Sequence, residues 1–363
     1  MTNTPNQLPA EGDRSLASIR AVIPRSCFER SNRLGFLHVA RDLVIYAMVM
    51  VAIVMVDQWW LLVPLELVAG LIVSGLFVLG HDAAHGALFE TKRLNANMAR
   101  LLFLPSFHVH EAWVFGHNRV HHGFTTRQGM DFVWHPVTPD QYAAMSTVAK
   151  LRHRFEWSWL GSGAYYLREV WWNKMMRFES PEKHADAIRR DKRLIYVWAL
   201  ISIGGSAALG WFVGGSVAAA VFMPVKLFVI PFLLFTGSIG WTVYVHHISP
   251  EMKWWTSKGW NRRAAQTEST TILRIPWILN VFFHHIFIHV PHHVDARIPW
   301  YKLPEAADAI KEALGDTVID RRLRLRDYFV ATKACKLYDF DAGTWLTYRQ
   351  AAEQGSDVKL TTA

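Results

Sequence analysis

The chain has 363 residues, of which 51% are hydrophobic and only 19% are charged, and its formal net charge is +9. A charged fraction well below the roughly 25% of soluble domains favours an integral membrane protein over a soluble helical one. The basic residues are spread over polar segments that flank apolar stretches, and no nucleic-acid-binding motif accompanies them. Nucleic acid is therefore not an expected partner.

Two apolar blocks predict the membrane-spanning helices. The first runs from about residue 41 to 80 with Trp59 and Trp60 in its middle, and the second from about 194 to 246 with Gly214 and Gly215 in its middle. Each block is long enough for two spans of about 20 residues. We therefore expect an all-α fold with four transmembrane helices in two hairpins, at about residues 41–60, 61–80, 194–213 and 221–246.

Lysine and arginine are distributed asymmetrically about these spans. Of the 39 basic residues, all but Lys226 lie in residues 1–42, 91–193 or 248–363. Cytoplasmic loops of membrane proteins carry such an excess, so both termini and the long middle segment are expected in the cytosol. No apolar core precedes residue 36, so no cleavable signal peptide is expected. The predicted location is the inner cell membrane, with several passes.

Two charged residues, Glu66 and Lys226, fall inside the predicted spans. At 1.5 Å per residue, both lie in the helix halves remote from the cytosol. Two interpretations stay open: the side chains pair across the second and fourth helices, or each reaches the membrane interface independently.

The two cysteines, Cys27 and Cys335, are both expected on the cytosolic side. Two cysteines this far apart in sequence do not supply a Cys-x-x-Cys zinc or iron–sulfur site, and a reducing cytosol disfavours a disulfide. We therefore look for metal ligands among the histidines.

A histidine pair, His81 and His85, stands at the cytosolic end of the second predicted span. Residues four apart on a helix lie on one face about one turn apart, so the pair offers two ligands on a rigid scaffold. A histidine pair at a helix end also occurs without any metal, so this pair alone is a weak signal.

Two further clusters repeat the spacing of four residues and add an adjacent ring: His117, His121 and His122, and then His289, His292 and His293. On a helix the adjacent ring points about 100° away, where it could reach a second metal, and adjacent histidines suit a geometry that bridges two ions. Imidazole is a good ligand for iron, zinc and copper. Eight rings are too many for one ion, so the pattern predicts two metals with four or five nitrogens each.

The three clusters resemble the histidine boxes of the integral-membrane fatty acid desaturases, which read His-x(3–4)-His and then His-x(2–3)-His-His twice. The flanking residues are also similar, as in the segments 80–86, 116–123, 131–134 and 292–299. The leader Ile23-Pro-Arg-Ser-Cys-Phe-Glu-Arg30 is similar to that of the bacterial acyl-lipid branch of Δ12/ω type. The resemblance covers roughly residues 23–305.

This resemblance implies a fold and an activity. The fold would be a membrane desaturase domain at 23–305 with a cytosolic helical cap that holds two non-haem irons. A flexible cytosolic tail, 1–22, would precede it, and a cytosolic helix and tail, 306–363, would follow. The activity would be that of an O2-dependent oxidoreductase that inserts a double bond into a fatty acyl chain linked to a lipid, CoA or a carrier protein. The two electrons would come from an external donor, a separate ferredoxin or cytochrome-type reductant.

The resemblance also implies a ligand at the end of the fourth span, where Tyr244-Val-His246-His247-Ile-Ser-Pro250 aligns on His247. No catalytic residue beyond the metal ligands is expected. The roles of His246, His284 and His285 stay open. The expected ligands are His81, His85, His117, His121, His122, His247, His289, His292 and His293.

Three carboxylates near the boxes, Asp82, Asp131 and Asp295, are expected to orient ligand rings by accepting the second ring N–H. Carboxylates commonly play this part beside metal-bound histidines.

Two other functions stay open. A diiron centre of the same kind also serves a hydroxylase, ketolase or acetylene-forming enzyme that acts on a lipid. A histidine-rich metal transporter is the alternative of a different class. Transporter ligands are expected near the bilayer midplane, whereas these histidines stand at helix ends.

Overall fold

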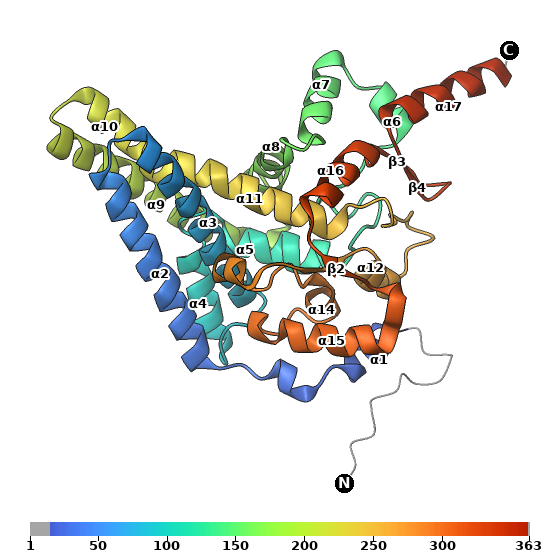
Figure 1. Ribbon diagram of the computed structural model, residues 1–363, viewed down its shortest axis with the longest axis horizontal. Helices are drawn as coiled ribbons and strands as arrows, with labels where there is room; N and C mark the ends of the chain where they lie inside the picture. The colour runs from blue at the N-terminus through green and yellow to red at the C-terminus, as the bar shows by residue number, and fades with distance from the viewer. Residues whose placement is uncertain (1–14, 362–363) are drawn as a thin grey trace, which may run out of the picture.

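The computed structural model describes residues 15–361, which form a mostly helical chain with two small sheets. Figure 1 shows long helices at one end of the molecule and short helices and strands at the other. Residues 1–14 of the expected flexible tail lie outside the described residues. Leu16–Val22 of that tail form helix α1, in which Ile19 and Val22 are buried. The apolar face of α1 therefore packs on the body of the protein.

Four helical segments are long and apolar enough to cross a membrane, as the sequence predicted. The last of them is continuous through α10 (Val217–Pro224), the π-helical turn η4 (Val225–Val229) and α11 (Ile230–His247). Helix α2 packs on α3, and α9 packs on α10 (Figure 1). The four segments are α2 (Asn32–Met55), α3 (Trp59–Ala84), α9 (Glu182–Gly214) and Val217–His247.

The break between the first two of these helices lies at residues 56–58, earlier than the expected border after residue 60. Trp59 and Trp60 therefore begin α3 instead of ending α2. A buried lysine accounts for the position of the break. Lys226 Nζ donates to Val56 O at 3.1 Å and lies 3.6 Å from the carboxylate of Asp57, so it satisfies the carbonyl that the end of α2 leaves free.

The direct pairing of Glu66 with Lys226 is not observed. Both side chains are buried, but the Lys226 ammonium contacts the α2–α3 turn, and neither carboxyl oxygen of Glu66 has a hydrogen-bond partner among the described residues. The turn offers a backbone carbonyl as well as a carboxylate, and the long lysine stem reaches it. Of the two interpretations, the structure therefore contradicts the ion pair between the spans.

Short helices connect the spans and cover their histidine-bearing ends. The chain enters α2 through the 3-10 turn η1 (Arg25–Phe28). Between α3 and α9 lie α4 (Lys92–Leu102), α5 (His110–Trp113), the π-helix η2 (Val114–His121), α6 (Pro139–Ala143), α7 (Thr147–Glu156), α8 (Ser162–Tyr165) and the π-helix η3 (Tyr166–Met176). After α11 lie α12 (Arg262–Glu268), η5 (Trp277–Leu279), α13 (Asn280–Phe283), α14 (His289–Val294), η6 (Trp300–Lys302), α15 (Leu303–Leu314), η7 (Gly315–Thr317), α16 (Leu325–Ala334) and α17 (Tyr348–Thr361).

Four short strands depart from the expectation of an all-α chain. β1 (Thr271–Arg274) pairs in parallel with β2 (Ile319–Arg322), and β3 (Leu337–Asp339) pairs antiparallel with β4 (Thr344–Leu346). Strands of three or four residues are too short to show an alternating pattern in the sequence. β1 also binds the chain that leads into α14, because Leu273 N donates to Phe287 O at 2.8 Å.

Helix α8 lies unusually close to α11 because glycines replace side chains at the contact. A Cβ built on Gly240 would lie 2.3 Å from the carbonyl oxygen of Ser162. The indole of Trp134 donates to the carbonyl of Gly240 at 3.2 Å, which adds a polar contact at the same place. The backbone of α11 is thereby fixed against the segments that surround its histidine-bearing end.

We expect Gly240→Ala to lower the free energy of unfolding by about 1–3 kcal/mol, because the added methyl forces α8 and α11 apart. Gly237→Ala, on the same helix, is the matched control, since a Cβ there meets nothing within 4 Å. Thermal unfolding of the detergent-purified variants measures both. Equal losses of stability in the two variants would contradict the close-packing account.

A buried charge cluster joins α4, α5 and α9. Arg100 binds the carboxylates of Asp191 and Glu111, with Nε–Oδ1 and Nη2–Oε1 distances of 3.0 and 2.8 Å. The His110 ring is 5% exposed, and its Nδ1 lies 3.5 Å from both carboxylates. Burial lowers the pKa of His110, but contact with Asp191 and Glu111 outweighs it, so the pKa is raised above its usual value. A protonated His110 balances the charges of the cluster.

The stability that His110 contributes is therefore fully present below a pH of about 6.5 and is lost as the pH rises through the raised pKa. We expect the thermal unfolding temperature of the wild type to fall over this alkaline range more than that of His110→Gln. His285→Gln should keep the wild-type dependence, because burial lowers the pKa of His285. Parallel curves for the wild type and His110→Gln would show that His110 is neutral throughout.

Candidate metal centre

The nine expected ligands, distant in sequence, converge at the ends of α3 and α11. Eight of them are at most 9% exposed, and His85 is half-buried. They form two groups, and within each group the nitrogens that face the centre lie within 4.8 Å of one another. The first group is His81, His85, His117, His122 and His292, and the second is His121, His247, His289 and His293.

The second histidine cluster lies on the π-helix η2, which decides how its rings are shared. In a π-helix the backbone bonds run from residue i+5 to residue i, and His122 N donates to His117 O at 3.0 Å. This wider turn brings His117 and His122 together, with Nε2 atoms 3.2 Å apart, and turns His121 toward the other group. The structure thus groups His117 with His122 instead of with His121.

The third cluster divides differently, because α14 is an ordinary helix. His289 and His293, four apart, belong to the second group, whereas His292 reaches the first group and lies 4.7 Å from His81 between ring centroids. The rings of His122 and His293 stack at 4.4 Å, so the two groups touch. Each of the last two clusters thus supplies ligands to both groups.

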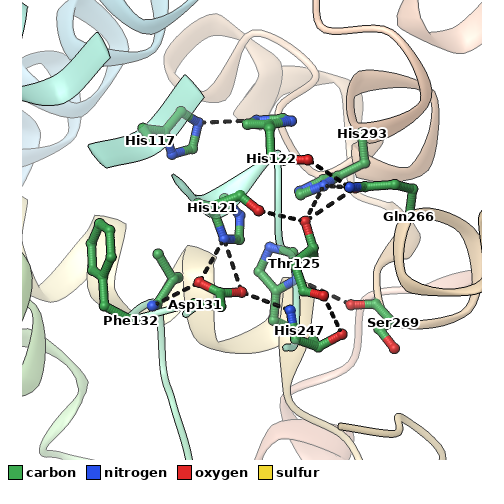
Figure 2. A network of polar contacts seen from close by, with 12 residues as sticks. His117, His121, His122, Thr125, Asp131, Phe132, His247, Gln266, Ser269 and His293 are labelled. Carbon is green, nitrogen blue, oxygen red and sulfur yellow. Dashed lines mark hydrogen bonds and ion pairs between the residues drawn. The ribbon is translucent and has the colours of Figure 1, made fainter. Parts of the chain in front are cut away.

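Asp131 orients the ring of His121. His121 Nδ1 lies 3.0 Å from Asp131 Oδ1, and the backbone amides of Thr126 and Val133 donate to the same carboxylate (Figure 2). Thr126 has a positive φ of 53°, a strained conformation that aims its amide at Asp131. With Nδ1 bonded to the carboxylate, Nε2 of His121 faces the centre with a free lone pair.

The other two predicted carboxylates behave differently. Asp82 Oδ1 lies 3.5 Å from His81 Nδ1, while Oδ2 accepts the backbone N–H of Trp300 at 2.8 Å. Asp295 contacts no ligand ring and binds Arg20 and Arg297, each at 2.7 Å. Of the three carboxylates, only Asp131 forms a hydrogen bond to a ligand ring. Asp295 follows α14 in extended backbone, which turns it away from the rings.

Two supporting groups escaped the sequence analysis. Gln266 Oε1 accepts from His293 Nδ1 at 2.6 Å, and its amide donates to the carbonyl of His122 at 2.7 Å, so one side chain spans both groups (Figure 2). The carbonyl of Ser269 lies 3.0 Å from His247 Nδ1. A lone glutamine in a polar segment and a backbone oxygen give no recognisable pattern in a single sequence.

The remaining histidines near the boxes belong to neither group. His246 stacks on His289 at 3.8 Å between ring centroids. His284 Nε2 lies 2.7 Å from the buried carboxylate of Asp42, which fastens this segment to α2. His285 stacks on Trp300. His108 lies between the Ser106 carbonyl and the Tyr166 hydroxyl.

Six histidines of the two groups are held neutral. Burial, and then repulsion between neighbouring rings, lowers the pKa of these residues well below the usual value: His85, His117, His122, His289, His292 and His293. A neutral imidazole keeps a lone pair for a metal. Such clustering of neutral donors would be costly without an ion to bind them.

Buried ring nitrogens without a hydrogen-bond partner show that the site fits a metal ion. Buried polar nitrogens are almost always hydrogen-bonded, and an unpaired one costs about 1–3 kcal/mol. Buried nitrogens without a partner among the described residues occur on rings from both groups: His81 Nδ1, His85 Nε2, His247 Nε2, His289 Nδ1, His292 Nδ1 and Nε2, and His293 Nε2. A set of imidazoles with no carboxylate in either group suits iron, zinc or copper.

An apolar cavity of about 510 Å³ borders both groups on the membrane side. Aromatic and aliphatic side chains line most of it, and Trp113 stacks on His117 at 4.6 Å between ring centroids. Thr242 and Tyr166 are its polar side chains apart from the histidines. The cavity opens onto His81, His117, His121, His246, His247 and His289.

Curated relatives show similarity over most of the chain. It is 27% identical over 340 residues to "Omega-6 fatty acid desaturase, chloroplastic" of Glycine max, covering 91% of this chain and 75% of the relative. It is 28% identical to "sn-1 oleoyl-lipid 12-desaturase" of Picosynechococcus sp., covering 89% and 90%. It is 26% identical to "sn-1 acyl-lipid omega-3 desaturase (ferredoxin)" of Nostoc sp., covering 83% and 82%.

Residues 57–323 match the family model described as fatty acid desaturase. This range is more than half of the chain and contains all nine converging histidines as well as the apolar cavity beside them. Sequence similarity and site chemistry therefore agree. The chain belongs to the fatty acid desaturase family.

Proposed function

We propose that the chain is a membrane-bound acyl-lipid desaturase whose nine histidines hold two iron ions, five rings at one and four at the other. The observation that carries the proposal is two groups of buried imidazoles, with unpaired nitrogens, beside an apolar cavity. Bound iron would supply the oxidising power of O2 needed to attack an unactivated methylene. Two hydrogens leave the acyl chain, and O2, two electrons and two protons complete the formation of two waters.

The residues of the chain hold and orient the ligand rings. Asp131, Gln266 and the carbonyl of Ser269 each bind the outer nitrogen of a ring, so the inner nitrogen is an unprotonated donor. Such supporting partners typically change metal affinity or activity by 10–100-fold. No side-chain acid or base is assigned to the removal of hydrogen.

The apolar cavity binds the acyl chain and excludes water from it. Each buried methylene contributes about 0.8 kcal/mol, so a long chain is favoured over a short one. The stacked Trp113 and the His108-bonded Tyr166 fix the walls of the cavity beside the centre. The position of the cavity relative to the two metals then selects which methylenes react.

The relatives' names favour an acyl-lipid substrate over a CoA or carrier-protein ester, and one of them names ferredoxin. A ferredoxin-type external donor is accordingly proposed here. The same names do not favour a hydroxylase, ketolase or acetylene-forming enzyme, or a metal transporter. We place the protein in the inner membrane as two helical hairpins, with both termini and a helical cap over the metals in the cytosol.

Expression in a bacterium that lacks polyunsaturated lipids tests the reaction. We expect lipids lighter by two hydrogens, located by mass spectrometry, and no product from His121→Ala or His292→Ala. Because each variant removes a ligand from one group, bound iron should fall by about one of two ions. His285→Ala is the matched control and should keep both irons and turnover. Addition of one oxygen to the lipid would identify a hydroxylase instead.

The topology is tested by labelling introduced cysteines in intact cells. Ser216, in the α9–α10 turn, and Gln58, in the α2–α3 turn, should react from outside, whereas Val148 in α7 should react only after permeabilisation. Cys27 and Cys335 are buried and give little background. External labelling at Val148 would overturn the proposed orientation.

A further inference from the structure

The centre has a second, polar side. An open cleft of about 1710 Å³ reaches His85, His122 and His293, so rings of both groups border it. One wall is the N-terminal segment of α1 and η1, which contains part of the Ile23–Arg30 leader noted in the sequence. The opposite wall comes from the start of α12 and from residues 294–297.

The cleft is strongly basic. Four arginines line it, Arg20, Arg25, Arg262 and Arg297, against the single carboxylate of Asp295. Asp295 already binds Arg20 and Arg297. Arg25 and Arg262 are exposed, and neither of them forms an ion pair with Asp295, whose partners are Arg20 and Arg297. The cleft therefore presents uncompensated positive charge at the edge of the metal centre.

The cleft is not a route for the acyl chain. The cavity on the membrane side and the cleft share no lining residue, and each borders a different set of histidines. A chain of methylenes would have to cross the wall of ligand rings to pass from one to the other. An electron needs no such passage, because it is delivered to the edge of the centre.

The cleft lies far from the turns that join the spans in pairs. In Figure 1, α1 and α12 are at the opposite end of the molecule from the α9–α10 turn, which marks the far ends of two spans. In the proposed orientation this end of the molecule faces the cytosol, from which a soluble protein can approach it.

We propose that the segment 16–28, with Arg262 and Arg297, forms the docking cleft for an acidic one-electron carrier protein of iron–sulfur type. This proposal rests on the proposed function, which requires two electrons for each double bond. Each docked carrier is oxidised by one electron, so two dockings supply the pair that, with two protons and the two substrate hydrogens, reduces O2 to two waters. Positive charge speeds the encounter with an acidic partner and is screened by salt.

The test uses the full chain in nanodiscs and a plant-type [2Fe–2S] ferredoxin as the probe. In Arg25→Glu/Arg262→Glu, we expect the Kd for ferredoxin to rise at least tenfold and ferredoxin-driven turnover at low ferredoxin concentration to fall similarly. Arg324→Glu/Arg326→Glu makes the same change of charge outside the cleft, on exposed residues, and should shift the Kd less than twofold. Photoreduced deazaflavin, a small donor, should restore the turnover of the cleft variant.

The outcomes separate the two proposals. A wild type that forms no double bond with either donor refutes the proposed function, whereas unchanged ferredoxin affinity in the cleft variant refutes the docking cleft alone. A variant that deazaflavin does not restore, and whose apparent KM for the lipid is raised, would assign the cleft to a lipid headgroup and overturn the proposal. Ferredoxin binding that is independent of salt would also contradict it.

Discussion

The structure depends on the convergence of nine imidazoles, on several of which a buried nitrogen has no protein partner among the described residues. Each unpaired nitrogen would cost about 1–3 kcal/mol, so the centre is stable only when something binds those lone pairs. The supporting contacts face the other way: Asp131, Gln266 and the Ser269 carbonyl hold the outer nitrogens and leave the inner ones free. Under the proposed function, metal binding would be coupled to the final folding of these segments, because the histidines come from α3, η2, α11 and α14.

The two groups do not consist of whole histidine clusters, because the second and third clusters each contribute rings to both groups. The π-helix η2 brings His117 and His122 to one group and His121 to the other, and the ordinary helix α14 keeps His289 with His293 and gives His292 to the first group. The segments η2 and α14 thus each contribute rings to both groups. Gln266 adds a further link, because it hydrogen-bonds to both His122 and His293. A shift of η2 or α14 would therefore disturb both groups together. Buried hydrogen bonds hold both segments, such as that of His121 with Asp131 and that of Leu273 with Phe287.

Much of this could be predicted from the sequence where the signal is local. Long apolar runs predicted the four spans, and histidine spacing predicted eight of the converging rings, because both patterns involve neighbouring residues; His247 was expected only from the family resemblance. The pairing of His117 with His122 could not be predicted, because it depends on a π-helix whose sequence resembles an ordinary helix. Gln266 and the contact of Lys226 with the α2–α3 turn depend on tertiary contacts between distant segments, which a single sequence does not display.

The placement of the histidines at helix ends follows from the two environments that the site must join. A centre at the bilayer midplane would meet the acyl chain but not a polar reductant, and one in a soluble domain would have no hydrocarbon wall. At the ends of α3 and α11, the rings of His81 and His247 face an apolar cavity. The rings of His85 and His293 face an arginine-lined cleft instead. The histidine rings themselves separate the apolar cavity from the polar cleft. Each environment therefore reaches the rings from its own side, and no loop has to open.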